Sequence, residues 1–350
     1  MEQFFQLKQH GTTVRTEIMA GFTTFMAMAY ILMVNAGMFA ELEGQVTYNA
    51  VYIATAISAV IGTVLIGLLS NLPLAQASGM GLNAYFVYTV CFGIGLSYAN
   101  ALVLVLADGI IFTLLTITGL RRKIFDAIPS AVRMAIPAGI GLFIAFLGLQ
   151  NAGLVVDSST LVGLASFNLY SGTATWGSIM PMLVTFFALL AIAAMSRRGV
   201  KGSVLFGILG GAVAYYILGF TVPGFYDGFA ESLSFNPFTA FSEFAQLSFG
   251  KVFTEGFNFT PYIEANGMGS FVIMFITTAL AFCMVDMFDT LGTLYGACAR
   301  GGLLTKEGEV PHIDRAMLAD AIATTTGAIC GTSTVTTFVE SSAGVGEGGR

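Results

Sequence analysis

The sequence predicts an all-α protein that crosses a membrane many times. Charged residues make up 10% and hydrophobic residues 56% of the 350 residues, and the mean hydropathy is +0.82. Soluble domains carry roughly 25% charged residues, so this composition is typical of an integral membrane protein. Acids also lie deep inside apolar segments, which indicates that the protein acts at membrane depth.

Runs of about 20 apolar residues predict nine membrane spans, and a tenth begins near residue 333. The polar N-terminus lacks a signal-peptide pattern, so we expect the first span to stay uncleaved. The longest loop, 221–265, follows the seventh span. The nine spans lie near 17–37, 49–69, 73–92, 98–119, 132–152, 175–195, 201–220, 270–296 and 314–331.

The charge distribution predicts the orientation of these spans. All of the 14 Lys and Arg residues except Lys251 fall on the same side as the N-terminus, while acids dominate the opposite loops. The positive-inside rule therefore predicts a cytoplasmic N-terminus and an external 221–265 loop. Because an odd number of spans, seven, precedes this loop, the eighth span enters the membrane from the opposite side to the first. A repeat after the loop would therefore be inverted, as in many secondary transporters.

The third span contains residues that interrupt a helix. Pro73 and the pair Gly79 and Gly81 are poor helix-interior residues. We predict an extended stretch near 73–78 and then a short helix that starts between Gly79 and Asn83. Its N–H groups would face a cavity, where Asn83 offers both a donor and an acceptor.

The sequence of the tenth span also indicates an interrupted helix. Residues 331–338 are rich in Thr and β-branched residues, and small residues follow Glu340. We predict an extended stretch and then a half-helix that starts near Glu340. The third and tenth spans are counterparts in two inverted seven-span repeats, and paired interruptions of this kind indicate a transporter site.

The eighth span places carboxylates in its apolar core. Asp286 and Asp289 lie at i and i+3, and Thr290 and Thr293 continue the same helical face. A carboxylate in hydrocarbon costs at least ~3 kcal/mol, so these side chains should face a protein interior or a wet cavity. The predicted spans contain no Lys or Arg that could neutralise them, apart from three at the first or second position of a span, on the side of the N-terminus: Arg133, Lys201 and Arg315.

Such acids can exchange protons, so we expect proton coupling through Asp286, Asp289 and Glu340 without a metal or cofactor. Structural roles remain open for each position: a helix-to-helix hydrogen bond for Asp286, a backbone cap for Asp289 or Asn83, and a helix-dipole partner for Glu340. The four cysteines show neither metal-site nor disulfide spacing.

Four stretches resemble the nucleobase–cation symporter-2 superfamily, specifically its adenine/guanine/hypoxanthine permease (AzgA-like) branch. The resemblance implies about fourteen spans in two inverted repeats of seven, arranged as a core and a gate domain. It implies proton-coupled purine uptake and no enzymatic activity. The stretches are AGFTTFMAMAYILMVNAGMF (20–39), GMGLNAYFVYTV (79–90), VDMFDTLGTLYG (285–296) and GTSTVTTFVESSAGVGEGGR (331–350).

By motif position, the resemblance implies that Asn83, Asp286 and Glu340 bind the substrate, with Gly81 and Asp289 in support. Phe338, in the same stretch as Glu340, is a candidate to stack on a flat ring. Ser341 follows Glu340 where the xanthine/uracil branch usually has Asn, which favours the adenine/guanine/hypoxanthine branch but leaves the base open.

The resemblance also implies a domain division. The first repeat would occupy 1–220, with core 1–119 and gate 120–220. After the external loop 221–265, residues 266–350 would form the core part of a second repeat. The chain stops within the tenth span, so we expect a fragment of a longer transporter.

The expected partners are a purine nucleobase, the lipid bilayer and, as a candidate, a second copy of the chain. The expected location is the plasma membrane, of the bacterial inner-membrane type. A nucleic-acid partner is not expected, because the sequence has no basic patch. The alternatives are a uracil/xanthine-type symporter, an anion transporter of the related inverted-repeat fold, a membrane enzyme, and a receptor or assembly subunit without transport activity.

Overall fold

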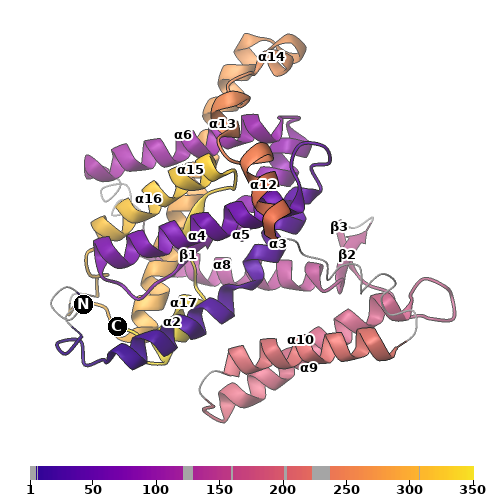
Figure 1. The fold of residues 1–350 in the computed structure, drawn as a ribbon, viewed down its shortest axis with the longest axis vertical. Helices are drawn as coiled ribbons and strands as arrows, with labels where there is room; N and C mark the ends of the chain where they lie inside the picture. Colours follow the sequence, from indigo (N-terminus) through magenta and orange to yellow (C-terminus); the bar gives the residue numbers. More distant parts are fainter. Residues whose placement is uncertain are drawn as a thin grey trace. The chain divides into compact units, whose positions relative to one another are not determined.

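The structure is a computed structural model, and it is mostly helical (Figure 1). It describes residues 5, 7–120, 129–158, 161–200, 203–222, 237–306 and 308–350. The elements are α2 (Val14–Met28), α3 (Tyr30–Ala40), α4 (Tyr48–Ser70), β1 (Gln76–Ser78), α5 (Met80–Ala84), the π-helical segment η1 (Tyr85–Gly93), α6 (Tyr98–Ile117), α8 (Ser130–Asn151), β2 (Val155–Ser158), β3 (Leu161–Leu164), α9 (Trp176–Arg197), α10 (Ser203–Thr221), α12 (Pro237–Leu247), α13 (Lys251–Thr254), α14 (Thr260–Asn266), α15 (Met268–Gly301), α16 (Ile313–Cys330), β4 (Val335–Thr337) and α17 (Ser341–Gly346).

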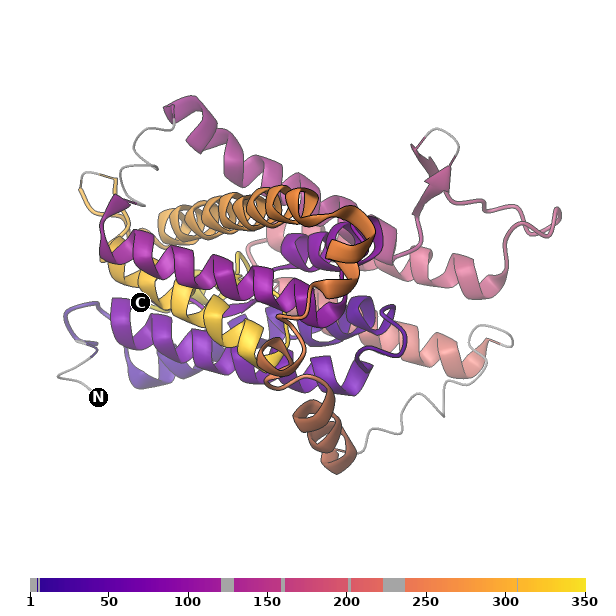
Figure 2. The same ribbon diagram turned by 90° about the horizontal axis from the view of Figure 1, so that it is seen from above.

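The chain forms two compact units. One unit comprises 1–140 and 237–350, and the other comprises 141–236. In the first unit α16 contacts both α4 and α6, and these three long helices run side by side in both views (Figure 1 and Figure 2). The C-terminal α17 contacts both α2 and α15. The two ends of the sequence therefore belong to one structural unit.

Polar side chains set the starts of the long helices. Thr13, Thr47 and Ser97 each have extended backbone, and each accepts a hydrogen bond from a main-chain N–H in the first turn of the helix that follows. This capping satisfies donors that the helix cannot pair internally. Asn71 ends α4 in the left-handed conformation, with φ of 54°, and the chain then turns toward β1.

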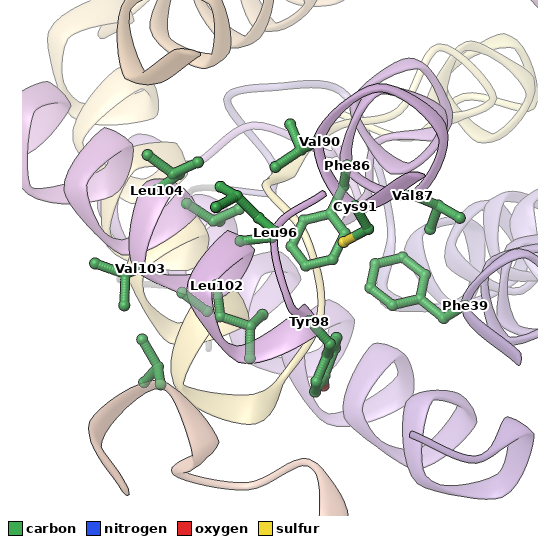
Figure 3. Packing of buried hydrophobic residues seen from close by; sticks show 14 of the residues in the cluster. Phe39, Phe86, Val87, Val90, Cys91, Leu96, Tyr98, Leu102, Val103 and Leu104 are labelled. Carbon is green, nitrogen blue, oxygen red and sulfur yellow. The ribbon is translucent and has the colours of Figure 1, made fainter. Parts of the chain in front are cut away.

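Aromatic packing holds the end of the third segment against its neighbours. The ring centroids of Phe39 and Phe86 lie 4.8 Å apart, and the ring of Tyr98 meets both at 6.1 Å. Figure 3 shows these rings together with the side chains of η1 and α6. This cluster fixes the helical continuation of the third segment beside α3 and α6.

The third and tenth segments are both broken, as predicted. β1 pairs with β4 in antiparallel register, with Gln76 opposite Thr337, Ala77 opposite Thr336 and Ser78 opposite Val335. Short helices, α5 and α17, follow the two strands. The extended stretches predicted before Gly79 and before Glu340 are confirmed.

Within the described residues, five helical stretches are long and apolar enough to cross a membrane, which supports a multi-pass membrane protein. Helices also occupy the predicted fifth, seventh and ninth segments, as α8, α10 and α16. The predicted count of ten spans and the inverted repeat stay predictions. The five stretches are Val14–Ala40, Tyr48–Ser70, Tyr98–Ile117, Trp176–Arg197 and Met268–Gly301.

The described part of the segment predicted as an external loop contains three helices, which the sequence does not predict, and its external location stays a prediction. Residues 237–266 form α12, α13 and α14, while 223–236 lie outside the described residues. α12 packs on α4, where its Ala240 is buried. Glu243 accepts hydrogen bonds from Thr47 Oγ1 at 2.6 Å and from Asn49 Nδ2 at 3.4 Å. These tertiary contacts order a segment whose composition is that of a loop.

The second unit contains a helix pair and a hairpin. α9 packs against α10, both in the lower part of Figure 1. Gly207 and Gly211 of α10 face Ile192 and Ala188 of α9, so small residues allow the two backbones to approach closely. β2 and β3 pair antiparallel, with Val155 opposite Leu164.

One prediction concerns packing on the strand pair. A Cβ added to Gly327 of α16 would lie 2.7 Å from Val335 Cγ2 and 2.8 Å from the Ser333 carbonyl oxygen, whereas one added to Gly67 of α4 has nothing within 4 Å. Gly327→Ala should destabilise the protein by about 1–3 kcal/mol through overpacking. Gly67→Ala, the matched control, should leave the melting temperature in detergent equal or higher, because alanine favours helix. Equal melting temperatures for both variants would contradict the packing described.

Candidate functional site

The candidate site is built around the pairing of β1 with β4. Beyond the strands, Gly79 N–H donates to the Thr334 carbonyl at 3.0 Å and Phe338 N–H donates to the Ala75 carbonyl at 2.9 Å. The side chains of both strands are buried. The backbone groups freed by the two interrupted helices therefore satisfy each other, as groups at membrane depth must.

Asp289 of α15 lies against the start of α5. A Cβ on Gly79 would be 2.7 Å from Thr336 Cγ2 and 3.4 Å from Asp289 Oδ2, so glycine permits the strand pair and α15 to approach here. The carboxylates of Asp320 and Glu340 are near enough to repel that of Asp289. Acids from three separate elements therefore converge on the strand crossing.

Asp320 of α16 is bound into the crossing by hydrogen bonds. Its Oδ1 accepts from Gln76 Nε2 at 3.3 Å, and its Oδ2 accepts from Thr290 Oγ1 at 2.8 Å. Gln76 Nε2 also donates to Thr337 Oγ1 at 3.3 Å, and the hydroxyls of Thr290 and Thr336 lie 2.8 Å apart. This network ties α15 and α16 to both strands.

Glu340 stands at the start of α17, and Tyr30 Oη donates to its Oε1 at 2.6 Å. Tyr30 begins α3, directly after the one-residue interruption between α2 and α3. Phe338, two residues before Glu340, is buried. α3 thus holds the carboxylate of Glu340, which follows the second broken segment.

Asp286 lies one helical turn before Asp289 and is buried. Its Oδ2 is 3.5 Å from Thr324 Oγ1 of α16, and the same hydroxyl donates to the Val335 carbonyl at 3.0 Å. Asp286 therefore faces the α16 side of the crossing, while Asp289 faces the α5 side. Its predicted role in substrate binding stays a prediction.

Asn83 of α5 is buried in a cluster of hydroxyl groups. Its Oδ1 accepts from Ser78 Oγ at 2.9 Å and from Ser333 Oγ. Ser78 Oγ also lies 2.9 Å from Thr332 Oγ1. Asn35 Nδ2 of α3 donates to that threonine at 2.9 Å. The amide of Asn83 is consequently held by side chains of both broken segments and, through Thr332, by α3.

The predicted residues thus lie around one strand crossing. Asn83 and Gly81 come from α5, Asp289 from α15, and Glu340 and Phe338 from the approach to α17. α5 has five residues and α17 has six, so side chains rather than long helix dipoles supply the polar groups here.

Sequence reasoning left several polar residues of this network unassigned: Asn35, Gln76, Ser78 and Ser333. It placed Thr332 only within the extended stretch 331–338 and gave Asp320 no binding role. A signal was present for some of them, because an amide or a carboxylate inside an apolar helix is costly unless it has partners. Asn35 and Asp320 carry that signal.

An apolar cavity of about 500 Å³ lies beside the crossing, between α2, α4 and the approach to β1. Leu72 and Ala75 line it on one side and Gly344 of α17 on another. Its lining contains none of the residues predicted to bind substrate, so we do not assign the substrate to it.

The sequence matches the permease family over residues 15–349. It is 38% identical over 360 residues to the guanine/hypoxanthine permease PbuG of Bacillus subtilis, covering 100% of this chain and 74% of that protein. It is 34% identical to the adenine permease AdeP of Escherichia coli, covering 100% of this chain and 71% of that protein.

The transmembrane domain of a cyanobacterium bicarbonate transporter, BicA, has a similar fold. Its TM-score is 0.55 at 15% sequence identity, over 96% of this chain and 77% of that one. At this identity the likeness concerns the fold alone. The sequence matches extend over nearly the whole chain, and this chain therefore belongs to the permease family, within the nucleobase–cation symporter-2 proteins.

Proposed function

We propose that this chain carries purine nucleobases (adenine, guanine or hypoxanthine) across the cell membrane, coupled to protons. The names of its relatives as guanine/hypoxanthine and adenine permeases support the substrate class. The observation that carries the proposal is the convergence of Asn83, Asp289 and Glu340 on the crossing of two interrupted segments.

In this proposal the N–H groups of the base donate to the carboxylates of Asp286 and Glu340. Hydrogen bonds to a charged group in a low dielectric contribute on the order of 2 kcal/mol each. Asn83 forms hydrogen bonds with another edge of the base, and the ring of Phe338 stacks on the face of the base. Gly81, which has no side chain, lets the base approach the backbone closely. A flat, hydrogen-bonding heterocycle satisfies all these groups together.

An acidic site also weighs against the alternative of an anion transporter. The carboxylates of Asp320 and Glu340 each lie near enough to repel that of Asp289, and an anionic substrate would add a further like charge. A neutral base that donates hydrogen bonds lowers the electrostatic cost of the site. The bicarbonate transporter therefore serves as a precedent for the fold rather than for the substrate.

Proton coupling follows from the same electrostatics. A proton bound by Asp286, Asp289 or Glu340 would reduce the repulsion among the acids, and the site would then cross the membrane with less charge. No metal or cofactor is needed for this step. We assign Asp289 as the main proton-carrying group because Gly79 and two other carboxylates surround it.

Alternating access needs a core that carries the site and a gate. We propose residues 1–119 and 266–350 as core and 120–220 as gate, in the inverted-repeat arrangement expected from the sequence. We also propose a cytoplasmic N-terminus in a bacterial inner membrane, because the basic residues lie on that side of the predicted topology. A second copy of the chain is a candidate partner.

The binding role predicts large losses when single carboxylates are replaced. Asp286→Asn and Glu340→Gln should each weaken purine binding about 30-fold, the effect of losing about 2 kcal/mol. Binding of radiolabelled adenine and hypoxanthine to purified protein would measure this. Glu264→Gln, at an exposed acid of α14, is the control and should bind as the wild type does. Unchanged purine affinity in Asp286→Asn would reject the role of Asp286.

The coupling role predicts proton movement with the base. Adding purine to energised cells or proteoliposomes in weak buffer should make the outside medium more alkaline, with or without sodium. Asp289→Asn should retain purine binding and lose the alkalinisation, because the carboxylate that carries the proton is gone. Uptake that requires sodium and moves no protons would contradict proton coupling while leaving the purine assignment intact.

A further inference from the structure

A chain of hydrogen bonds runs from α4 to the amide of Asn83. Asn35 Nδ2 contacts Thr55 Oγ1 at 2.7 Å and Thr332 Oγ1 at 2.9 Å. Thr332 Oγ1 lies 2.9 Å from Ser78 Oγ, which lies 2.9 Å from Asn83 Oδ1. All five side chains are fully buried. Once the donor and the acceptor are known at one end of this series of hydrogen bonds, they are therefore known at every step.

The α4 end fixes that direction. Thr55 Oγ1 lies 2.7 Å from the Val51 carbonyl oxygen, which can only accept, so Thr55 gives its single hydroxyl hydrogen to that oxygen. The atom of Asn35 that contacts Thr55 must then be a donor, which is Nδ2. The same nitrogen donates to Thr332, and Thr332 keeps its own hydrogen for the next residue.

The remaining steps follow from counting hydrogens. Thr332 donates to Ser78, and Ser78 donates to Asn83 Oδ1. Ser333 Oγ donates to the same amide oxygen. If the amide of Asn83 were reversed, Ser78 and Ser333 would both have to accept from it, and one hydroxyl hydrogen among them would lack an acceptor. Only one orientation of Asn83 satisfies every hydroxyl in the chain.

We propose that this series of hydrogen bonds from Thr55 to Asn83, called the relay below, fixes Asn83 as a hydrogen-bond donor to the substrate. Asn83 then recognises an acceptor nitrogen or carbonyl oxygen of the base. The inference rests on the proposed purine transport and deepens it. Asn35 and Thr332 are positioning residues, because they act on the substrate only through Ser78 and Asn83.

The unpartnered amide nitrogen of Asn83 supports this assignment. Asn83 is buried, and no group in the described part of the chain accepts a hydrogen bond from its Nδ2. A buried donor without an acceptor is costly, which indicates that a bound molecule supplies the acceptor. Ionised carboxylates only accept, so Asp286 and Glu340 can pair with the N–H groups of a purine but not with its ring nitrogens. A donor amide completes the complementarity.

The test is a double-mutant cycle between the protein and the ligand. Binding of adenine, 1-deazaadenine, 3-deazaadenine and 7-deazaadenine is measured for the wild type and for Asn83→Ala. Each analogue replaces one ring acceptor by C–H. One analogue should bind the wild type about tenfold more weakly than adenine, the usual effect of one lost hydrogen bond. In Asn83→Ala the same analogue and adenine should bind alike.

The relay is tested at residues predicted not to touch the ligand. Asn35→Asp replaces the donor by an acceptor of the same shape, so Thr332 would donate toward residue 35 and no longer toward Ser78. Ser78 can then donate to Thr332 instead of to Asn83, so the amide of Asn83 is free to reverse. Asn35→Asp should therefore lose the discrimination against that one analogue. Thr332→Ser, which keeps the hydroxyl, and the exposed-site control Asn266→Asp should retain it.

Two results would overturn the proposal. One is that Asn83→Ala weakens adenine and all three analogues by the same factor, which would make Asn83 a structural residue. The other is that Asn35→Asp keeps the wild-type discrimination between adenine and that analogue, whether or not it weakens both, which would leave the relay without influence on recognition. Failure of the wild type to bind any purine would instead reject the proposed function, so the two failures are distinguishable. A melting temperature near that of the wild type shows that each variant is folded.

Discussion

The antiparallel pairing of β1 with β4 is the constraint on which this structure depends. A helix that stops inside a membrane exposes N–H and C=O groups where no bulk water can bind them, and each unsatisfied group costs several kcal/mol. Two such breaks, at Gln76–Ser78 and Val335–Thr337, satisfy each other by pairing. Neither interrupted segment would be stable alone, so the two halves of the first unit must fold together.

The pairing in turn decides where the polar side chains lie. Gly62 of α4, Gly79 and Gly327 of α16 lie where a Cβ would collide with the strands or their neighbours, so the surrounding helices can reach the crossing only with glycine at these positions. The acids of α15 and α16 are then brought against the strands. A site of this kind sits on rigid packed elements, which suits recognition of a flat ring whose hydrogen-bonding groups are fixed in one plane.

Much of this arrangement could be predicted from sequence, because the signals are local. Pro73 and the glycines after it predict a helix break, the Thr-rich stretch before Glu340 predicts another, and buried acids predict function. The network could not be predicted in the same way. The register that places Gln76 opposite Thr337, and the contacts of Asn35 with residues 20 and 297 positions away, depend on tertiary packing. The helices in 237–266 were missed because contacts such as that of Glu243 with Thr47 order them.

The register of the strand pair can be measured directly by disulfide cross-linking in a variant that lacks the four native cysteines. Paired residues of antiparallel strands have Cα atoms ~5.5 Å apart, within reach of a disulfide, whereas diagonal neighbours are ~7–8 Å apart. The account predicts that Ala77→Cys links to Thr336→Cys in the folded protein in membranes and links poorly to Thr334→Cys. Equal yields for the two pairs, or no link between residues 77 and 336, would contradict it.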